Sequence, residues 1–156
     1  MNRSSALLGG MVVVGVGAVG AALVTQHVFG MQPCAWCVLQ RLIFLSIATA
    51  ALIGLLWRAP VGRRIGAGLA LLLALCGVSA ALWQHFVAAS STSCDLSLAE
   101  RIVGATGLDG RFPDVFMAMA NCADAATKLM GLPYEVWSLG LFVVRAAMTL
   151  LVLRRP

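Results

Sequence analysis

The stretch CAWCVLQRLIFLSIATAALIGLLW, residues 34–57, joins two cysteines to an apolar run that is long enough to cross a membrane. A helix over this run begins near Val38 and places Cys37 at its N-terminus, where unpaired N–H groups favour a thiolate over a thiol. Arg41 then lies one turn further along on the same face, and its positive charge favours the thiolate again. Cysteines this close can form a strained, easily exchanged disulfide, which suits redox chemistry better than bracing a fold, so the stretch predicts a redox-active sulfur at a membrane surface.

Three further apolar runs accompany this one. The chain has 156 residues, of which 61% are apolar and 11% charged, and a soluble domain carries about twice that charged fraction. We therefore expect an all-α membrane protein, a four-transmembrane-helix bundle in one domain (1–156) with a long aqueous loop that contains a short amphipathic helix. The expected spans are about 6–26, 38–57, 65–83 and 136–153, and the expected loops are 27–37 and 84–135. The first run could also be a signal peptide, but it is longer than the usual apolar region of about 7–15 residues.

Arginines at the ends of the runs indicate how the chain is oriented. They lie at the N-terminus, in the loop between the second and third runs, and at the C-terminus: Arg3, Arg58, Arg63, Arg64, Arg154 and Arg155. These segments hold no acidic residue, so they must share one side of the membrane, and both cysteine-bearing loops face the opposite, oxidising side. The net charge of +5 is thus a topology signal, and with one tyrosine and no basic aromatic surface we expect no binding to nucleic acid.

The loop from Gln84 to Glu135 differs in character from the rest of the chain, because it holds all six acidic residues. Between Asp114 and Met130 its apolar residues recur at helical spacing. This pattern predicts an amphipathic segment that either lies on the membrane surface or packs against the bundle.

The same loop carries a second pair of cysteines, Cys94 and Cys122. A bridge between them would serve either as a structural staple or as a mobile shuttle. The C-x-x-C pair on the same side of the membrane favours the shuttle, because two neighbouring dithiols can exchange. Zinc held by Cys34, Cys37 and the loop pair is an alternative, but structural zinc sites prefer two C-x-x-C knuckles and we expect no metal. The fifth cysteine, Cys76, lies inside the third run as a lone thiol.

Electrons from such a site need an acceptor, and the sequence has no flavin or nucleotide fingerprint. A lipid-soluble quinone is the natural candidate for a site that opens onto lipid. Arg41 could stabilise a reduced quinone oxygen beside Cys37. His85, just after the third span, is expected at the same membrane depth and could bind a quinone carbonyl or relay a proton. An interfacial histidine without a role is the alternative reading of His85.

These residues together resemble the DsbB family, the bacterial inner-membrane disulfide bond formation proteins. The resemblance runs nearly the whole length of the chain. Its motifs are Cys-x-x-Cys-x-x-x-Arg between the first two runs, Gln26-His27-Val28, His85, Cys94-Asp95, Asn121-Cys122-Ala123, Gly131-Leu132-Pro133 and Trp137-Ser138-Leu139-Gly140.

The resemblance implies a thiol–quinone oxidoreductase that reoxidises the periplasmic dithiol oxidase DsbA, or a DsbA-like partner. The partner's thiolate would attack Cys94, the released Cys122 would pass electrons to the Cys34–Cys37 pair, and Cys37 would form a charge-transfer adduct with ubiquinone (or menaquinone). Arg41 would support that adduct. The resemblance also implies a multi-pass protein of the bacterial inner (cytoplasmic) membrane with both termini cytoplasmic and a periplasmic loop that includes a horizontal amphipathic helix.

Two residues depart from the family pattern. Gln40 stands where an acid can precede the arginine, and Arg145 lies inside the last span, where we expect it to face another helix or snorkel. Two other readings remain. A protein similar to vitamin K epoxide reductase runs related chemistry on a four-helix bundle, but places its C-x-x-C late in the chain. A membrane scaffold with a merely stapled loop would have no redox activity.

Overall fold

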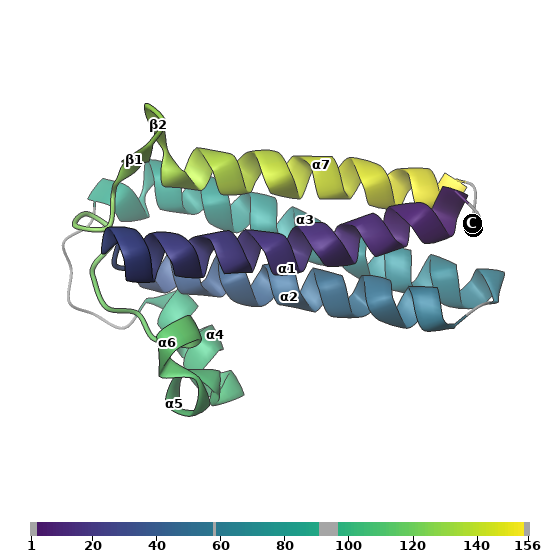
Figure 1. Ribbon diagram of the computed structural model, residues 1–156, viewed down its shortest axis with the longest axis horizontal. Coiled ribbons are helices and arrows are strands. Elements are labelled where there is room, and N and C mark those ends of the chain that lie inside the picture. Colours follow the sequence, from purple (N-terminus) through teal and green to yellow (C-terminus); the bar gives the residue numbers. More distant parts are fainter. Residues whose placement is uncertain (1–2, 58, 91–96, 155–156) are drawn as a thin grey trace.

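The computed structural model describes residues 3–57, 59–90 and 97–154. Four long helices run along one another as a bundle (Figure 1). They are α1 (Arg3–Phe29), α2 (Ala35–Leu56), α3 (Pro60–Phe86) and α7 (Tyr134–Arg154). All four are long and apolar enough to cross a membrane. The predicted fold class, an all-α four-helix membrane bundle, is confirmed.

The helices extend beyond the apolar runs at most of their ends. Helix α2 already begins at Ala35, so Cys37 lies within its first turn. Helix α3 begins at Pro60, where proline's fixed φ suits the first helical position. Helix α1 ends before Gly30, which has a φ of +67° and reverses the chain direction toward α2.

Helix α2 lies at the centre of the packing, with α1 on one side and α3 on another, and α7 packs mainly on α3. Close approach of α2 and α3 depends on Gly66, because a Cβ there would lie 2.7 Å from the main-chain oxygen of Ala50 and 2.8 Å from the Cα of Gly54. Small residues that let backbones meet are typical of helix pairs in lipid. Nearer the middle, the rings of Phe44 and Phe142 stack with centroids 4.1 Å apart.

Arg145 points into the bundle and does not snorkel to its end. Its side chain is fully buried and donates hydrogen bonds to the main-chain oxygens of Phe44, at 3.3 Å, and Met11. Its guanidinium carbon lies 5.2 Å from the centre of the Phe44 ring, within range of a cation–π contact. Arg145 therefore faces other helices, as one of the two expectations had it, and these helices are α1 and α2.

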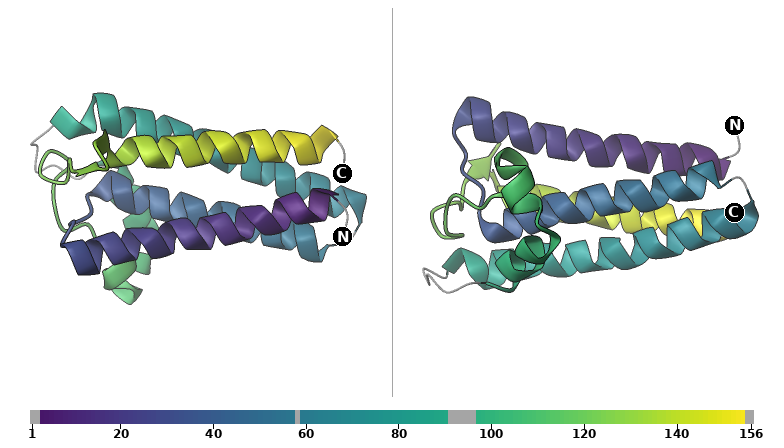
Figure 2. Two further views of the ribbon diagram at one scale, coloured as in Figure 1. Left: turned by 45° about the horizontal axis from the view of Figure 1, so that its top comes forward. Right: turned by 90° about the horizontal axis from the view of Figure 1, so that it is seen from below.

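The two ends of the bundle differ. The start of α1, the connection between α2 and α3, and the end of α7 lie together at one end, as both views in Figure 2 show. This end carries arginines at helix ends, namely Arg3, Arg63, Arg64 and Arg154. The connection between α1 and α2 and the long segment from α3 to α7 lie at the other end (Figure 1).

The long segment contains several short elements. They are a 3-10 turn (Ala88–Ser90), α4 (Leu98–Thr106), α5 (Leu108–Arg111), α6 (Pro113–Phe116), β1 (Lys128–Leu129) and β2 (Leu132–Pro133), the last two forming an antiparallel hairpin. Helix α4 is amphipathic, and its buried residues Ala99 and Val103 belong to the core that includes α2. A capping box starts α4, because the Ser97 hydroxyl accepts from the Glu100 amide and the Glu100 carboxylate accepts from the Ser97 amide.

The prediction of a helix between Asp114 and Met130 is wrong. Only Pro113–Phe116 is helical there, and the amphipathic helix of the loop is α4. After α6 the chain is held by other hydrogen bonds: the amides of Met119 and Ala120 donate to the Pro33 oxygen at 2.9 and 3.3 Å. The Asn121 side chain then accepts from the amide of Asp124 at 2.8 Å, a local bond that competes with helix formation.

Candidate functional site

The C-x-x-C pair occupies the start of α2. Cys34 immediately precedes the helix in an extended conformation, and its main-chain oxygen accepts from the Val38 amide at 3.0 Å. The sulfur atoms of Cys34 and Cys37 lie 3.1 Å apart, and Cys34 is fully buried. A disulfide of about 2.05 Å could close between these two sulfurs with a small movement of either side chain.

The loop brings a third sulfur to this pair. The side chain of Cys122 is hydrogen-bonded to that of Cys34, and its pKa lies below the usual thiol value chiefly because Cys34 donates to it. The pKa of Cys34 is raised by its hydrogen bonds to Cys122 and Cys37 and by burial. Of the two thiols, Cys122 is therefore the one that loses its proton more readily. The predicted partner of Cys122, Cys94, lies outside the described residues.

Arg41 is buried one turn after Cys37 and is held by three acceptors. Its Nη1 donates to the Gln26 side chain at 2.7 Å and to the Val115 oxygen at 3.0 Å, and its Nη2 donates to the Ala22 oxygen at 3.5 Å. Its Nε is buried and has no hydrogen-bond partner among the described residues. The guanidinium is therefore fixed in direction, and its Nε–H remains available as a donor.

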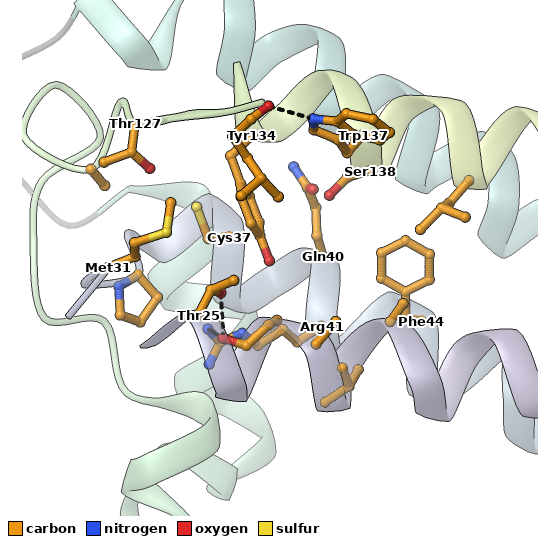
Figure 3. Close-up of a pocket in the computed structure, with 18 of the residues that line it drawn as sticks. Thr25, Met31, Cys37, Gln40, Arg41, Phe44, Thr127, Tyr134, Trp137 and Ser138 are labelled. Carbon is orange, nitrogen blue, oxygen red and sulfur yellow. Dashed lines mark hydrogen bonds between the residues drawn. The ribbon is translucent and has the colours of Figure 1, made fainter. Parts of the chain in front are cut away.

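A cavity of about 170 Å³ lies between α1, α2, α7 and the loop. Its wall includes Cys37, Gln40 and Arg41 from α2, Thr25 from α1, and Tyr134 and Ser138 from α7. In Figure 3 these side chains point from three helices toward one space, with the Tyr134 ring extending across it. The remaining wall is mostly apolar, so the cavity combines an apolar surface with the thiol of Cys37, the guanidinium of Arg41, the amide of Gln40 and the phenol of Tyr134.

Two glutamines, one on α2 and one on α3, form a hydrogen-bonded pair that ends on the same sulfur, and neither was predicted to have a role. Gln84 donates from Nε2 to the sulfur of Cys37 at 3.2 Å, and Gln40 donates from Nε2 to Gln84 Oε1 at 2.7 Å. Both are buried, with 5% and 3% of their surface exposed. Their position in or beside apolar runs could have indicated a buried, hydrogen-bonded role, because a polar side chain inside a membrane bundle needs a partner.

His85 is not brought to this cavity. Its Nδ1 lies 2.9 Å from the Glu135 carboxylate, and 41% of its side chain is exposed. The residue before it, Gln84, is the one that contacts Cys37, because neighbouring positions on a helix point about 100° apart. A role for His85 in cofactor binding stays a prediction.

The remaining candidates lie apart from the sulfur cluster. Cys76 is exposed on α3, in the middle of a span. Over residues 3–57, 59–90 and 97–154, no group of three or more His, Cys, Asp or Glu side chains is arranged so that it could hold a metal ion.

Comparison with known proteins gives a consistent result. The sequence model of the family described as "Disulfide bond formation protein DsbB" matches residues 3–152. A protein named disulfide bond formation protein B from Aromatoleum aromaticum is 32% identical over 96% of this chain and 92% of its own. A protein of the same name from Pseudomonas syringae pv. tomato is 33% identical over 93% of this chain and 85% of its own. Another from Nitrosospira multiformis is 35% identical over 88% of this chain and 83% of its own.

Proposed function

This chain belongs to the DsbB family of disulfide bond formation proteins, and on that premise we propose that it oxidises a DsbA-like dithiol partner and delivers the electrons to a membrane quinone. Family membership makes the chain a multi-pass membrane protein and a disulfide oxidoreductase. The observation that carries the finer proposal is the row of sulfurs Cys122, Cys34 and Cys37, which ends at a cavity beside Arg41.

The first exchange takes place at the loop pair. A thiolate of the reduced partner attacks Cys94 of a Cys94–Cys122 disulfide; the new intermolecular S–S bond forms as the old one breaks, and Cys122 leaves as a thiolate. The partner's second thiol, on losing its proton, attacks its own mixed-disulfide sulfur and releases Cys94. The partner is then a disulfide, and the loop pair holds the electron pair.

The second exchange passes the electron pair inward. The Cys122 thiolate attacks Cys34 of a Cys34–Cys37 disulfide, and Cys37 leaves as a thiolate. The contact between Cys122 and Cys34, whose side chains are hydrogen-bonded when both are thiols, supports this direction of attack. Cys94 then closes the bond to Cys122 and frees Cys34, so the Cys34–Cys37 pair ends as the reduced dithiol.

The cavity residues fit a quinone as the final acceptor. When bound, a quinone supplies the capacity to take up two electrons and two protons from the dithiol, and the Cys34–Cys37 disulfide is restored. A cavity of about 150 Å³ admits a benzene ring, so about 170 Å³ is comparable with the space that an unsubstituted quinone ring needs. Arg41 holds a fixed positive charge at the wall, and its unpartnered Nε can serve an anionic oxygen. Cys37 is the sulfur on that wall.

We further propose the orientation in the bacterial inner membrane. The end of the bundle with Arg3, Arg63, Arg64 and Arg154 faces the cytoplasm, and the cysteine-bearing end faces the periplasm, where disulfides persist. A membrane-impermeant alkylating reagent added to intact cells with reduced cysteines should label Cys94. Labelling of Cys94 only from the cytoplasmic side would overturn this orientation.

Purified protein tests the reaction. Reduced DsbA and ubiquinone should be consumed in equal amounts by the native chain, and Cys37→Ser and Cys34→Ser should abolish turnover. Mixing with ubiquinone should give a visible absorbance band that disappears in Cys37→Ala. Cys76→Ser is the matched control, since Cys76 lies on α3 away from the cluster, and it should turn over normally. Unimpaired turnover in Cys37→Ser would refute the proposed function.

A further inference from the structure

Gln84 approaches the reactive sulfur from a helix that does not line the cavity. Cys37 lies on the cavity wall, which is built by α1, α2, α7 and the loop, whereas Gln84 belongs to α3. Its Nε2 lies 3.2 Å from Cys37 Sγ, within the range for a hydrogen bond to sulfur. The cavity face of the sulfur is therefore left to an electron acceptor while the amide holds another side.

The direction of the Gln84 amide is set by Gln40. Gln40 Nε2 donates to Gln84 Oε1 at 2.7 Å, so the oxygen of Gln84 is engaged and its NH₂ group faces the sulfur. An amide NH₂ can only donate, and a thiolate is the form of cysteine that accepts most strongly. The two amides thus form a chain of donors that ends on Cys37.

This chain also reaches the cavity. Gln40 lies on the wall beside Cys37 and Arg41, as Figure 3 shows for all three side chains. Both glutamines are more than nine-tenths buried, and a buried amide without partners is costly. The pair is therefore held in one arrangement by its own bonds and by Cys37.

We propose that Gln84 is a catalytic residue that stabilises the Cys37 thiolate by donating a hydrogen bond to it, and that Gln40 is the positioning residue that aims the Gln84 amide. The proposal rests on the proposed function, in which Cys37 is released as a thiolate and then donates electrons. It adds an uncharged donor on α3 to the positive charge that Arg41 supplies from α2.

The test measures the thiolate directly, without partner or quinone. In full-length protein carrying Cys34→Ser, the ultraviolet absorbance of the Cys37 thiolate is compared at one pH among variants. Gln84→Leu should lower the ratio of thiolate to thiol about tenfold, the usual effect of losing a hydrogen bond to a charged group. Gln84→Glu should lower it at least as much, because a carboxylate repels the thiolate. Gln40→Leu should lower it by a smaller factor, because the Gln84 donor is kept but no longer aimed.

Ser79→Ala is the control, since among the residues that the structure describes the Ser79 hydroxyl bonds to the Leu75 oxygen of its own helix alone, at 3.0 Å. An unchanged ratio in both Gln84 variants would overturn the proposal, whatever the turnover. If Gln84→Leu does not fold, the nearly isosteric Gln84→Glu decides alone. Native protein that keeps a high thiolate ratio but oxidises no partner would instead refute the proposed function and leave the role of Gln84 standing.

Discussion

Arg41 Nη1 donates a hydrogen bond to Gln26 Oε1 at 2.7 Å, and this bond ties the start of α2 to the end of α1. The Gln26 amide in turn donates to the main-chain oxygen of Asp114 at 3.2 Å. Arg41 itself donates to the next carbonyl of that short helix, Val115, at 3.0 Å. One glutamine and one arginine therefore hold two spans and the loop together at the edge of the cavity.

Gln26→Leu should weaken the use of quinone while sparing the partner step. Without its acceptor the Arg41 guanidinium can turn away from the cavity, and losing a hydrogen bond to a charged group costs about 1.5–3 kcal/mol. We expect the half-saturating quinone concentration to rise roughly tenfold, with unchanged capture of reduced DsbA by Cys94. Steady-state kinetics and trapping of the mixed disulfide measure the two steps. His27→Leu, at an exposed neighbouring position, is the control; an equal loss of both steps would contradict the role given to Gln26.

The reactivity of reduced Cys122 should extend to unusually low pH. Its pKa is lowered because the Cys34 thiol donates to it, so thiolate persists as the pH falls below the range of an ordinary cysteine. Cys34→Ala removes that donor, raises the pKa and moves the onset of alkylation to higher pH. Mass spectrometry of alkylated Cys122 over a pH series measures this shift. Cys76→Ala should leave the profile in place; a profile that is the same in Cys34→Ala and native protein would argue against the contact.

Arg145 should be replaceable by a side chain of similar length without charge. Met11 and Phe44 lie inside helices whose carbonyls already accept a backbone amide, so Arg145→Met leaves no orphaned group and removes a buried charge. We expect thermal stability in detergent equal to or above that of the native chain. Arg145→Ala should be less stable by about 2–5 kcal/mol because it leaves a cavity. If Arg145→Met is as unstable as Arg145→Ala, the hydrogen bonds outweigh the cost of the buried charge.

Two glycines of α3 should respond in opposite ways to alanine. Gly66→Ala forces α2 and α3 apart, since the new Cβ would meet backbone at 2.7 and 2.8 Å, and we expect a loss of about 1–3 kcal/mol. Gly68→Ala, two positions later, meets nothing within 4 Å and should stabilise the helix by up to about 1 kcal/mol. Unfolding temperatures in detergent compare the two. A fall of equal size in both variants would mean that close approach at Gly66 is not what matters.

The amphipathic helix of the long loop was predicted in the wrong place from a local sequence pattern. Apolar residues between Asp114 and Met130 recur at helical spacing, yet hydrogen bonds to Pro33 and the local bond from the Asp124 amide to the Asn121 side chain keep most of that segment out of a helix. The better local signal was Ser97 followed by Glu100, which forms the capping box at the start of α4. A helix-capping signal depends on residues that are neighbours in the sequence, so it can be predicted. The contacts with Pro33 join residues far apart in the sequence, so they cannot.

Local sequence patterns were enough to predict the four spans and the position of the C-x-x-C pair with Arg41 one turn later. Hydropathy and helical spacing are local, and a segment in lipid must satisfy its own backbone hydrogen bonds. The packing of the helices and the loop, in contrast, is what brings Cys122 to Cys34, places Gln84 and not His85 at Cys37, and turns Arg145 toward α1 and α2. Residues that face lipid and residues that face the core are equally apolar here, so no pattern in the sequence reveals how each helix is rotated.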